Sequence, residues 1–563
     1  MNAAAIATSR DRTGRTLLAT AVTRWHISLS VTFLVALVIR LPYLATIPSL
    51  TDEAYEVLRG LQIARGELLP LTNVNAYLGS GYNYLLAAMF LLIGTDASVS
   101  RALVCAIGAA AAPATAVLAR TLGGSERVAI IAGGLVATSG VHVLVSSHVA
   151  WGHSVTPTVT ALAIAALVTA QRDATTFRWV LCGTLIGLMV QTHPTTVLFL
   201  PGAATYTLIA NPAAIRTRAT YLAGLAFVAV NANLVVFNLL SGGGSFAEAQ
   251  VVSAAYTRTR LAGLELYLDN LGRLGIASVR LLGGAVDIRQ DASAYLADPF
   301  PWVVLALLLL GGICRRVSLA ALWILPYALL LPLANAKFEV IPNGRFLAPL
   351  LPLTATAIAY GIDETTRRLS GPWRRTAFAG LAAFIMVWPL RSLGDRYGQM
   401  EVSLDMSRQI STAMATIRSV RDTAEPVALD PDLDKLWLDG GGDLRAAFKL
   451  HLAAAGIPHA EFEFRRQAER GDLNSCLRNE VELRRVDPRT SPAATRFTPD
   501  DSQTPIDESL TPYLLIRTVQ RSDRARDTQR GQTDEARWSL ITYSPPLAAS
   551  SRAVDRCAPG RLI

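Results

Sequence analysis

Two adjacent carboxylates, Asp52 and Glu53, directly follow the first long apolar stretch of the sequence. A carboxylate held at a membrane surface can act as a general base, taking the proton from a hydroxyl group whose oxygen attacks an electrophilic carbon. Acidic residues are also favoured in the first turn of a helix, where they interact with the helix dipole. Ser49 or Thr51 could cap such a helix, which would end at Gly66. The sequence therefore leaves a catalytic role and a capping role open for this acidic pair.

Three basic residues could bind an anionic group such as a phosphate, which accepts charge-assisted hydrogen bonds. Arg345 lies in the segment NGRFLAPLLP, Lys337 precedes it, and Arg59 follows the acidic pair. An arginine beside a membrane can instead extend its charged head to the interface, and this alternative stays open for Arg345. We expect Arg40, in the first apolar stretch, either to do the same or to pair with a carboxylate of a loop.

Three further side chains are candidates for contact with a substrate. His193 lies in QTHP, where Pro194 imposes a turn or kink at the end of an apolar stretch. His153 lies in SHVAWGHS, and Tyr82 lies in the tyrosine- and glycine-rich segment YLGSGYNYLLA. A histidine at the depth of His193 is often a hydrogen-bonded structural residue, so that role stays open beside substrate contact.

Motifs for metals and nucleotides are missing from the sequence, which contains no CxxC, HExxH or GxxxxGK(S/T) pattern. The segment that holds His148 and His153 offers imidazoles without a carboxylate. Four aspartates of a later loop could add acids, but the sequence does not place them: Asp269, Asp287, Asp291 and Asp298. A divalent metal is therefore possible without support from the sequence, and no cofactor is predicted with certainty.

The composition indicates a membrane protein, because 51% of the 563 residues are hydrophobic and only 17% are charged. Soluble chains carry about a quarter charged residues. The net charge of +9 comes from short basic clusters between apolar stretches, a distribution that does not predict nucleic-acid binding. We expect three parts: a cytosolic tail at 1–25, a helical transmembrane module at 26–392 and an extracytoplasmic domain at 393–563.

Eleven apolar stretches have about the 20 residues that a helix needs to cross a bilayer. They lie at 26–45, 98–119, 128–147, 154–170, 178–193, 195–210, 219–240, 300–314, 317–335, 344–362 and 376–392. A further stretch at 77–94 is ambiguous. If this stretch is re-entrant or interfacial and does not cross the membrane, every segment between spans that is assigned to the cytosol carries arginine. The segments 148–153 and 194, on the opposite side, carry none. This pattern predicts a cytosolic N-terminus and long outer loops at 46–97 and 241–299.

The C-terminal part alternates helical and strand-like pieces, which indicates a small α/β or α+β domain. Residues 403–420 and 443–455 have helical patterns, and residues 425–430, 461–465, 512–519 and 537–544 have strand patterns. Cys476 and Cys557 of this part could pair if it lies outside the cytosol. Cys105, Cys182 and Cys314 lie in apolar stretches and are interpreted as small hydrophobic residues.

Over roughly residues 26–392 the chain resembles the GT-C superfamily of membrane glycosyltransferases, which includes protein O-mannosyltransferases and the lipid A aminoarabinose transferase. The resemblance rests on the acidic pair and on the order of YLGSGYNYLLA, VSSHVAWGHSVTP, GLMVQTHPTTVLFLP and NGRFLAPLLP. It implies transfer of a sugar from a polyprenyl-phosphate donor to a hydroxyl of a glycan, lipid or protein, at the outer face of a bacterial inner membrane. Asp52 would be the base of an inverting displacement, Glu53 would assist, and Arg345 would bind the donor phosphate. Some members carry a further acid where this chain has His148 and His153.

Two other functions stay open. A transporter or flippase for lipids or glycans would show internal repeats and ionisable residues near the middle of the membrane. The sequence has no clear repeat, and its polar residues gather toward one face, which favours an enzyme at the interface. A non-catalytic relative acting as a scaffold is the other alternative, because histidines occupy the position of the family's additional acid.

Overall fold

The computed structural model of the 563-residue chain describes most of the helical part and short pieces of the C-terminal part. The described residues are 23–44, 51–256, 262–284, 297–313, 318–334, 345–395, 397, 427–429, 444–456, 459–461, 479–486, 513–520 and 536–539. They divide into two compact units. Unit 1 comprises Met1–Leu44, Gly66–Leu86 and Arg101–Tyr397, and unit 2 comprises Ala45–Arg65, Ala87–Ser100 and Gly398–Ile563.

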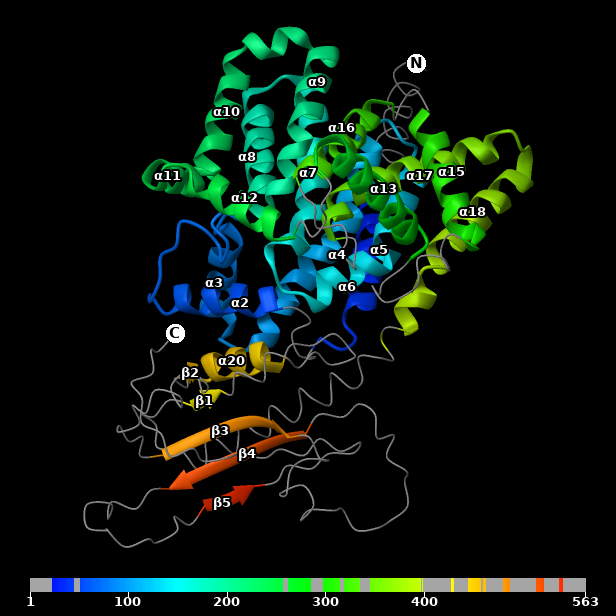
Figure 1. The fold of residues 1–563 in the computed structure, drawn as a ribbon. Coiled ribbons are helices and arrows are strands. Elements are labelled where there is room, and N and C mark those ends of the chain that lie inside the picture. The colour runs from blue at the N-terminus through cyan, green and yellow to red at the C-terminus, as the bar shows by residue number, and fades with distance from the viewer. Residues whose placement is uncertain are drawn as a thin grey trace, which may run out of the picture. The chain divides into compact units, whose positions relative to one another are not determined.

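Helices make up most of the described residues of the chain (Figure 1). A helix at 23–40 comes first. The α-helices that follow in the chain are α2 (Thr51–Ala64), α3 (Gly81–Ile93), α4 (Ala97–Thr121), α5 (Glu126–Thr138), α6 (Gly140–His148), α7 (Thr156–Asp173), α8 (Thr176–Thr192), α9 (Leu200–Ala210), α10 (Arg218–Val230), α11 (Ala232–Ser241), α12 (Gly244–Tyr256), α13 (Gly263–Leu282), α15 (Pro299–Ile313), α16 (Ser318–Ala334), α17 (Leu351–Arg367), α18 (Gly371–Val387) and α20 (Leu444–Ala454). Short 3-10 helices are η1 (Gly152–Val155), η2 (Pro194–Phe199), η3 (Pro212–Arg216) and η5 (Arg345–Leu350).

Nine of the eleven predicted spans overlap a described helix or a helix and its 3-10 extension, and the other two, 128–147 and 219–240, each overlap a bent pair of helices. Four segments have the length and apolar composition to cross a membrane: 98–121, 152–173, 346–367 and 371–395. Two bent pairs raise the number to six among the described residues if each pair is one span. The count of eleven stays a prediction. Helix α3 has 13 residues, about 20 Å of helix, which is too short to cross a core of about 30 Å alone.

Two of the helices break inside apolar sequence. Helices α5 and α6 meet at an angle of 59° around Ser139, whose backbone is extended, and α10 and α11 meet at 65° around Asn231. A break leaves backbone carbonyls without their helical partners, so other groups must satisfy them. Asn231 Nδ2 donates to the carbonyl of Phe227 at 2.9 Å, and Arg40 Nη1 donates to the carbonyl of Ala137 at 3.3 Å. Polar side chains therefore stabilise both breaks.

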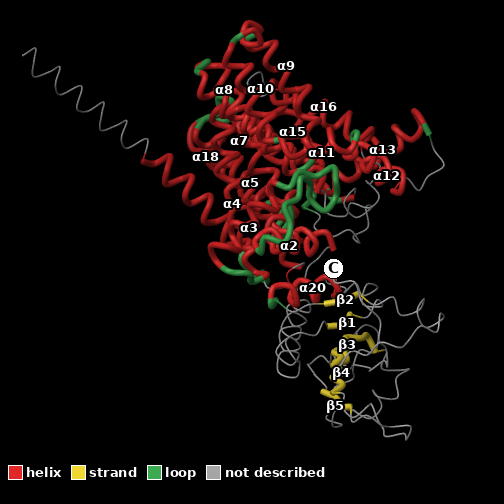
Figure 2. The backbone as a smooth tube through the Cα atoms, turned by 90° about the vertical axis from the view of Figure 1, so that its left-hand side faces the viewer, coloured by secondary structure: helices red, strands yellow, loops and turns green. Residues whose placement is uncertain are grey.

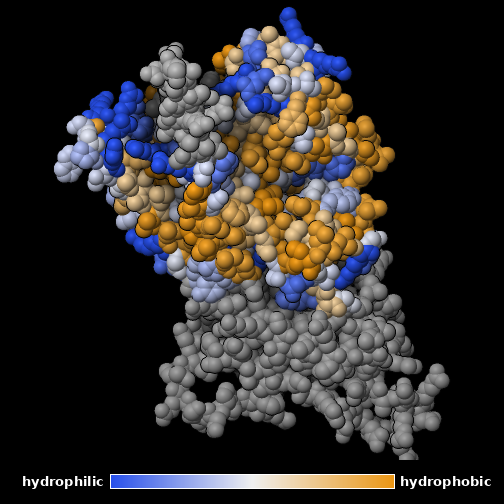
Figure 3. All heavy atoms as spheres, turned by 180° about the vertical axis from the view of Figure 1, so that it is seen from behind, coloured by the Kyte–Doolittle hydropathy of each residue, from blue (hydrophilic) through white to orange (hydrophobic). Residues whose placement is uncertain are grey.

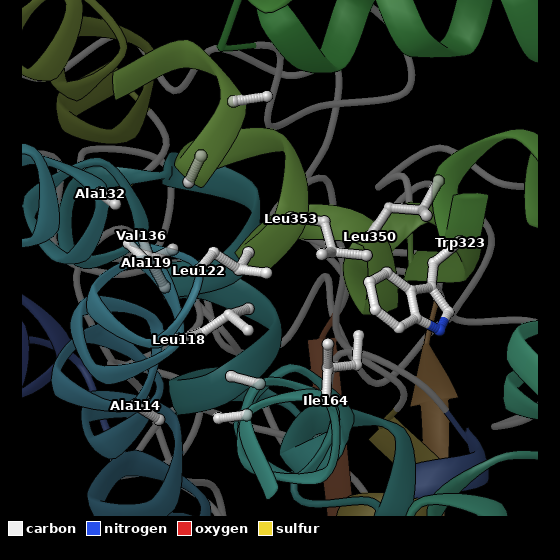
Figure 4. Close-up of a cluster of buried hydrophobic side chains, with 14 of the residues drawn as sticks. Ala114, Leu118, Ala119, Leu122, Ala132, Val136, Ile164, Trp323, Leu350 and Leu353 are labelled. Atoms are coloured by element: carbon white, nitrogen blue, oxygen red, sulfur yellow. The ribbon is translucent and has the colours of Figure 1, made fainter. Parts of the chain in front are cut away.

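The main hydrophobic core joins α4, α5, α7 and α17 with α16. Figure 4 shows Leu118 of α4 and Leu122, just after α4, on the side of the cluster that faces Leu353, with Ile164 and Trp323 on the far side. Many positions of this core are alanine, which lets helix backbones approach closely. A small apolar pocket is lined by residues of α7, α8, η2, α9 and α16, among them Met189.

Two glycines mark a close helix crossing. A Cβ built on Gly311 of α15 would lie 1.8 Å from the carbonyl oxygen of Ala357, and one on Gly361 of α17 would lie 2.1 Å from that of Leu307. No side chain fits at such a distance, so α15 and α17 require glycine at both positions. This kind of small-residue contact is typical of helix pairs in membranes.

Apolar side chains also cover much of the surface of the described part. Figure 3 shows them gathered in a broad zone with hydrophilic residues at either end. Large apolar side chains that are exposed in the described part include Leu91, Leu239, Leu240, Ile313 and Leu333. Scattered single apolar residues are normal on a soluble protein, whereas a continuous zone of this kind fits contact with lipid.

The described C-terminal residues contain one mixed sheet with strand order β2-β1-β3-β4-β5 (Figure 2). The strands are β1 (Val427–Leu429), β2 (His459–Glu461), β3 (Asn479–Val486), β4 (Tyr513–Gln520) and β5 (Ala536–Ser539). β1 pairs in parallel with β2 and β3, and β3, β4 and β5 pair antiparallel. Four of these strands overlap or adjoin predicted ones, whereas β3 was not anticipated. The predicted helix at 403–420 lies outside the described residues.

Candidate functional site

A pair of stacked histidines lies at the end of α8 in unit 1. The rings of His153, from η1, and His193, which ends α8, have centroids 3.9 Å apart with 18° between their planes. The amide of Thr195 donates to His193 Nδ1 at 3.3 Å. The same Nδ1 lies 2.8 Å from Thr195 Oγ1, and in the tautomer in which Nδ1 accepts from both groups the neutral ring carries its proton on Nε2. His153 is 4% exposed and His193 is partly exposed.

The start of η5 packs directly on the histidine pair. The ring of Phe346 lies 5.5 Å from that of His153 and 5.4 Å from that of His193. Tyr327 of α16, whose side chain is fully buried, donates its hydroxyl to the carbonyl of Phe346 at 2.5 Å. Arg345 is the chain neighbour of Phe346, so its Cα lies about 3.8 Å from that of Phe346. The structure thus brings the backbone of the predicted phosphate-binding residue to the two histidines, while the Arg345 side chain lies outside the description.

A second polar cluster holds the loop at 66–80, which follows α2 and precedes α3. Asn233 Nδ2 donates to the carbonyl of Leu71 at 2.8 Å and to Ser80 Oγ at 3.1 Å. The amide of Gly81 donates to Gln191 Oε1 at 3.3 Å. Gln191 Nε2 in turn donates to Asn233 Oδ1 at 2.6 Å. We call Gln191, Asn231 and Asn233 the amide clamp, since their side chains join α8, α10 and α11 to this loop.

Helix α12 holds the tip of the same loop. Ser245 Oγ donates to the carbonyl of Ala76 at 2.6 Å, and the amide of Ala76 donates to the carboxylate of Glu248. Inside the loop, Thr72 and Gly79 form an antiparallel bridge. A Cβ on Gly79 would lie 1.8 Å from Gln191 Oε1. Only glycine therefore lets the loop lie this close to the amide clamp.

Helix α2, in unit 2, carries the predicted acidic pair. Its described bounds, Thr51–Ala64, agree closely with the predicted helix. Glu53 is 2% exposed and Glu56 is 4% exposed, so α2 buries two carboxylates. Burial lowers the pKa of Arg59 from its ordinary value, and the nearby charge of Glu56 partly offsets that effect. The backbone of Asp52 lies in the first turn, and its side chain lies outside the description.

The other predicted residues lie at different places. Tyr82 begins α3 and is 4% exposed, so its ring is buried in unit 1. Lys337 lies outside the described residues, as do Cys314, Cys476 and Cys557. The buried Cys105 and Cys182 are free thiols, as expected for small apolar positions. Within the described ranges no group of three or more His, Cys, Asp or Glu side chains is arranged to hold a metal ion.

The expectation for Arg40 is wrong. Its side chain is fully buried and so does not extend to an interface, and among the described residues its hydrogen-bond partners include no carboxylate. Arg40 Nε donates to Ser146 Oγ at 2.8 Å, Nη1 donates to the carbonyl of Ala36 at 2.7 Å, and Nη2 contacts His142 Nδ1. The guanidinium is drawn inward because the break between α5 and α6 exposes acceptors beside it.

The amide clamp was missed by the sequence analysis. Gln191 precedes the QTHP histidine by two residues, and Asn231 and Asn233 interrupt an apolar stretch as NAN. Amides inside apolar sequence need hydrogen-bond partners, so these three residues carried a signal of a buried polar network. Which groups they contact depends on the break between α10 and α11, and no local pattern predicts that break.

Comparisons with known proteins identify relatives of the chain. Residues 80–236 match the family model described as dolichyl-phosphate-mannose-protein mannosyltransferase. This segment contains both stacked histidines and the whole amide clamp. A search of curated proteins finds no match.

Among solved structures, ArnT from Cupriavidus metallidurans bound to undecaprenyl phosphate has a TM-score of 0.54 and 13% identity, covering 82% of this chain and 93% of that chain. The apo state of ArnT has the same identity and coverage with a TM-score of 0.49. The archaeal oligosaccharyltransferase AglB from Archaeoglobus fulgidus, in complex with an inhibitory peptide and a dolichol-phosphate, has a TM-score of 0.46 and 15% identity, covering 81% of this chain and 69% of that chain. The family-model match and the fold shared with ArnT confirm the resemblance to GT-C membrane glycosyltransferases that the sequence motifs predicted.

Proposed function

We propose that this chain is a membrane glycosyltransferase that moves a sugar from a polyprenyl-phosphate donor to an acceptor hydroxyl. The reaction takes place at the outer face of a bacterial inner membrane, and the acceptor is a glycan, a lipid or a protein. The observation that carries the proposal is the contact of Phe346 with the stacked histidines, because it brings the start of η5 next to the polar rings of His153 and His193. The fold that holds these residues is shared with ArnT, whose structure contains undecaprenyl phosphate.

The donor phosphate is bound by Arg345 and His193. A guanidinium forms charge-assisted hydrogen bonds with phosphate oxygens, and the Nε2–H of His193 adds a second hydrogen-bond donor nearby. Tyr327 supports this arrangement by holding the carbonyl of Phe346, which fixes the backbone next to Arg345. Lys337 and Arg59 are weaker candidates for the same anion. His153 orients His193 through the ring stack, and the buried Tyr82 borders the clamped loop.

The chemical step is a single displacement with inversion at the anomeric carbon. The acceptor oxygen forms a bond to that carbon while the bond from the carbon to the phosphate oxygen breaks. The electron pair leaves with the polyprenyl phosphate, whose charge Arg345 stabilises. The carboxylate of Asp52 accepts the hydroxyl proton as the acceptor attacks. Glu53 assists from a buried position on α2, where it supports the orientation of the helix.

Release of polyprenyl phosphate tests the proposal. The full-length protein in nanodiscs is incubated with a panel of radiolabelled polyprenyl-phosphate sugars and a membrane extract as acceptor. We expect release by the parent and a loss of about 100-fold or more for Asp52→Asn, which matches the usual contribution of a general base. Glu67→Gln is the matched control, since Glu67 is exposed shortly after α2, and it should keep the parent rate.

The phosphate site is tested with the same assay at varied donor concentration. Arg345→Gln should raise the donor KM, and Arg345→Lys should restore part of the loss because an ammonium keeps the charge without the planar fork. Arg218→Gln, which removes an exposed cation from α10, is the control. Equal rates for the parent and Asp52→Asn would overturn the base assignment. No release from any donor would favour a transporter, a flippase or a scaffold.

A further inference from the structure

Helix α20 of the C-terminal region packs along α2, and both helices belong to unit 2. On α20, Leu450 is 5% exposed and Leu452 is 0% exposed. On α2, Ala54, Val57 and Leu61 are at most 1% exposed. Both helices therefore bury apolar side chains within the unit, and α20 also packs against β2 of the sheet.

A buried lysine joins the two helices. Lys449 of α20 is 5% exposed, and its Nζ donates to the hydroxyl of Tyr55 at 3.4 Å. The same Nζ lies 5.4 Å from the centre of the Tyr55 ring, within the range of a cation–π interaction. Positions 52 and 55 are neighbours on the surface of a helix, since they are three residues apart. Lys449 thus contacts the face of α2 on which position 52 lies.

The last carbonyls of α20 are satisfied by the same outer loop. Arg65, just after α2, donates to the carbonyl of Ala453, and Thr95 Oγ1 donates to that of Ala454 at 3.3 Å. The carboxylate of Asp96 also interacts electrostatically with His451. The final carbonyls of a helix need such partners because they have none within the helix. Two separate segments of the loop 46–97 therefore cap α20.

We propose that α20 is a docking helix for the loop 46–97, with Lys449 as a positioning residue for α2. The C-terminal domain holds α2 through this helix and sets the rotation of α2 about its axis. The rotation fixes where the first turn of α2, with positions 52 and 53, presents its carboxylates. The effect on activity rests on the proposed role of Asp52, whereas the docking itself does not.

Photo-crosslinking tests the docking without any substrate. Benzoylphenylalanine replaces Thr95 in the full-length protein in membranes, and tryptic peptides are analysed after irradiation. Thr95 is chosen because the replacement leaves the Lys449–Tyr55 contact intact. We expect crosslinks to the peptide 450–465, which follows Lys449 in the sequence. A protein that is folded and monodisperse but gives no crosslink to this peptide overturns the docking.

Kinetics test the positioning role. Lys449→Met should lower kcat about tenfold with a donor KM within twofold of the parent, since a small displacement of a reacting group is costly. Lys449→Arg should recover most of the loss, because it keeps the cation above the Tyr55 ring. An unchanged kcat in Lys449→Met, with the crosslink preserved, overturns the positioning role. A preserved crosslink together with a fully active Asp52→Asn leaves the docking in place and overturns the proposed base instead.

Discussion

The imidazole rings of His153 and His193 stack with their centroids 3.9 Å apart, and the ring of Phe346 lies against both. Two interpretations of this stack differ in what they require. A packing role needs only flat rings, whereas a role in binding the donor phosphate needs the Nε2–H of His193. The two roles can therefore be separated by a substitution that keeps the ring and removes its nitrogens.

We expect His193→Phe to keep the fold and to lower donor turnover about tenfold or more. A hydrogen bond to a charged group contributes about 1.5–3 kcal/mol, which corresponds to this loss. The change also removes the contact between His193 Nδ1 and Thr195. Thr195→Val is the control for the Oγ1 part of that contact and leaves the backbone amide in place. Both variants are compared by thermal unfolding and by polyprenyl phosphate release. Parent-like turnover in His193→Phe would assign the stack to packing alone.

We expect Gly79→Ala to destabilise the protein by about 1–3 kcal/mol, the usual cost of overpacking. The added Cβ would lie 1.8 Å from Gln191 Oε1, and Gln191 is held by its bonds to Val230, Asn231 and Asn233. Thermal unfolding in detergent measures the effect.

The controls for this prediction come from the same chain. A Cβ on Gly224 of α10 would meet no heavy atom of the described chain within 4 Å, so Gly224→Ala should be neutral or slightly stabilising. Gln191→Ala should remove the clash, so that Gly79→Ala costs less in that background than in the parent. If the free-energy costs of the two substitutions simply add in the double variant, the contact between Gly79 and Gln191 of the amide clamp is contradicted.

We expect Asp96→Ala to cost about 1 kcal/mol, because the carboxylate of Asp96 accepts from the amide of Ser98 at 2.8 Å and caps α4. A hydrogen bond with the Ser98 side chain is the main cause that lowers the pKa of Asp96 from its ordinary value of 3.8, and the bond from the Ser98 amide lowers this pKa further. A lowered pKa means that the unfolded chain binds the proton more tightly, so this stability is present above pH 3.8 and is lost as the pH falls through the folded pKa.

The difference in melting temperature between the parent and Asp96→Ala should therefore be constant near neutral pH and should shrink below about pH 4. Asp96→Asn serves as the control, since asparagine caps a helix without a charge. It should keep most of the stability and lose the pH dependence. A difference that grows toward low pH would contradict the capping assignment.

The helical part of the fold could be predicted from the sequence because apolar runs of about 20 residues are long, frequent and clearly bounded. The breaks at Ser139 and Asn231 could not, since they depend on distant partners such as Arg40 and the carbonyl of Gly187. Strand β3 was missed because its sequence NEVELRRV is highly charged and its apolar alternation is short.

The site was predicted only in part. The motifs around His153, His193 and Arg345 were selected, and the structure brings the two histidines and the backbone beside Arg345 together. Their stacking could not be foreseen, because it requires η1 and the end of α8 to meet. The roles of Asp52 and Arg345 stay predictions, as does the outer placement of the C-terminal domain.

The buried Arg40 has a consequence for the biogenesis of the protein. Its partners Ala137, His142 and Ser146 follow it by 97 to 106 residues. At about 5–20 residues per second, a ribosome needs about 5–20 s to make that stretch. A bare arginine costs about 2.5–3.5 kcal/mol on insertion scales at the centre of a span and less toward its end. If the first helix crosses the membrane as predicted, it is therefore disfavoured in lipid during this interval. Nascent chains that end before residue 137 should therefore stay beside the insertion machinery longer than the same chains with Arg40→Leu. The charge of Arg40 thus delays the release of the first helix until the partners of Arg40 have been synthesised.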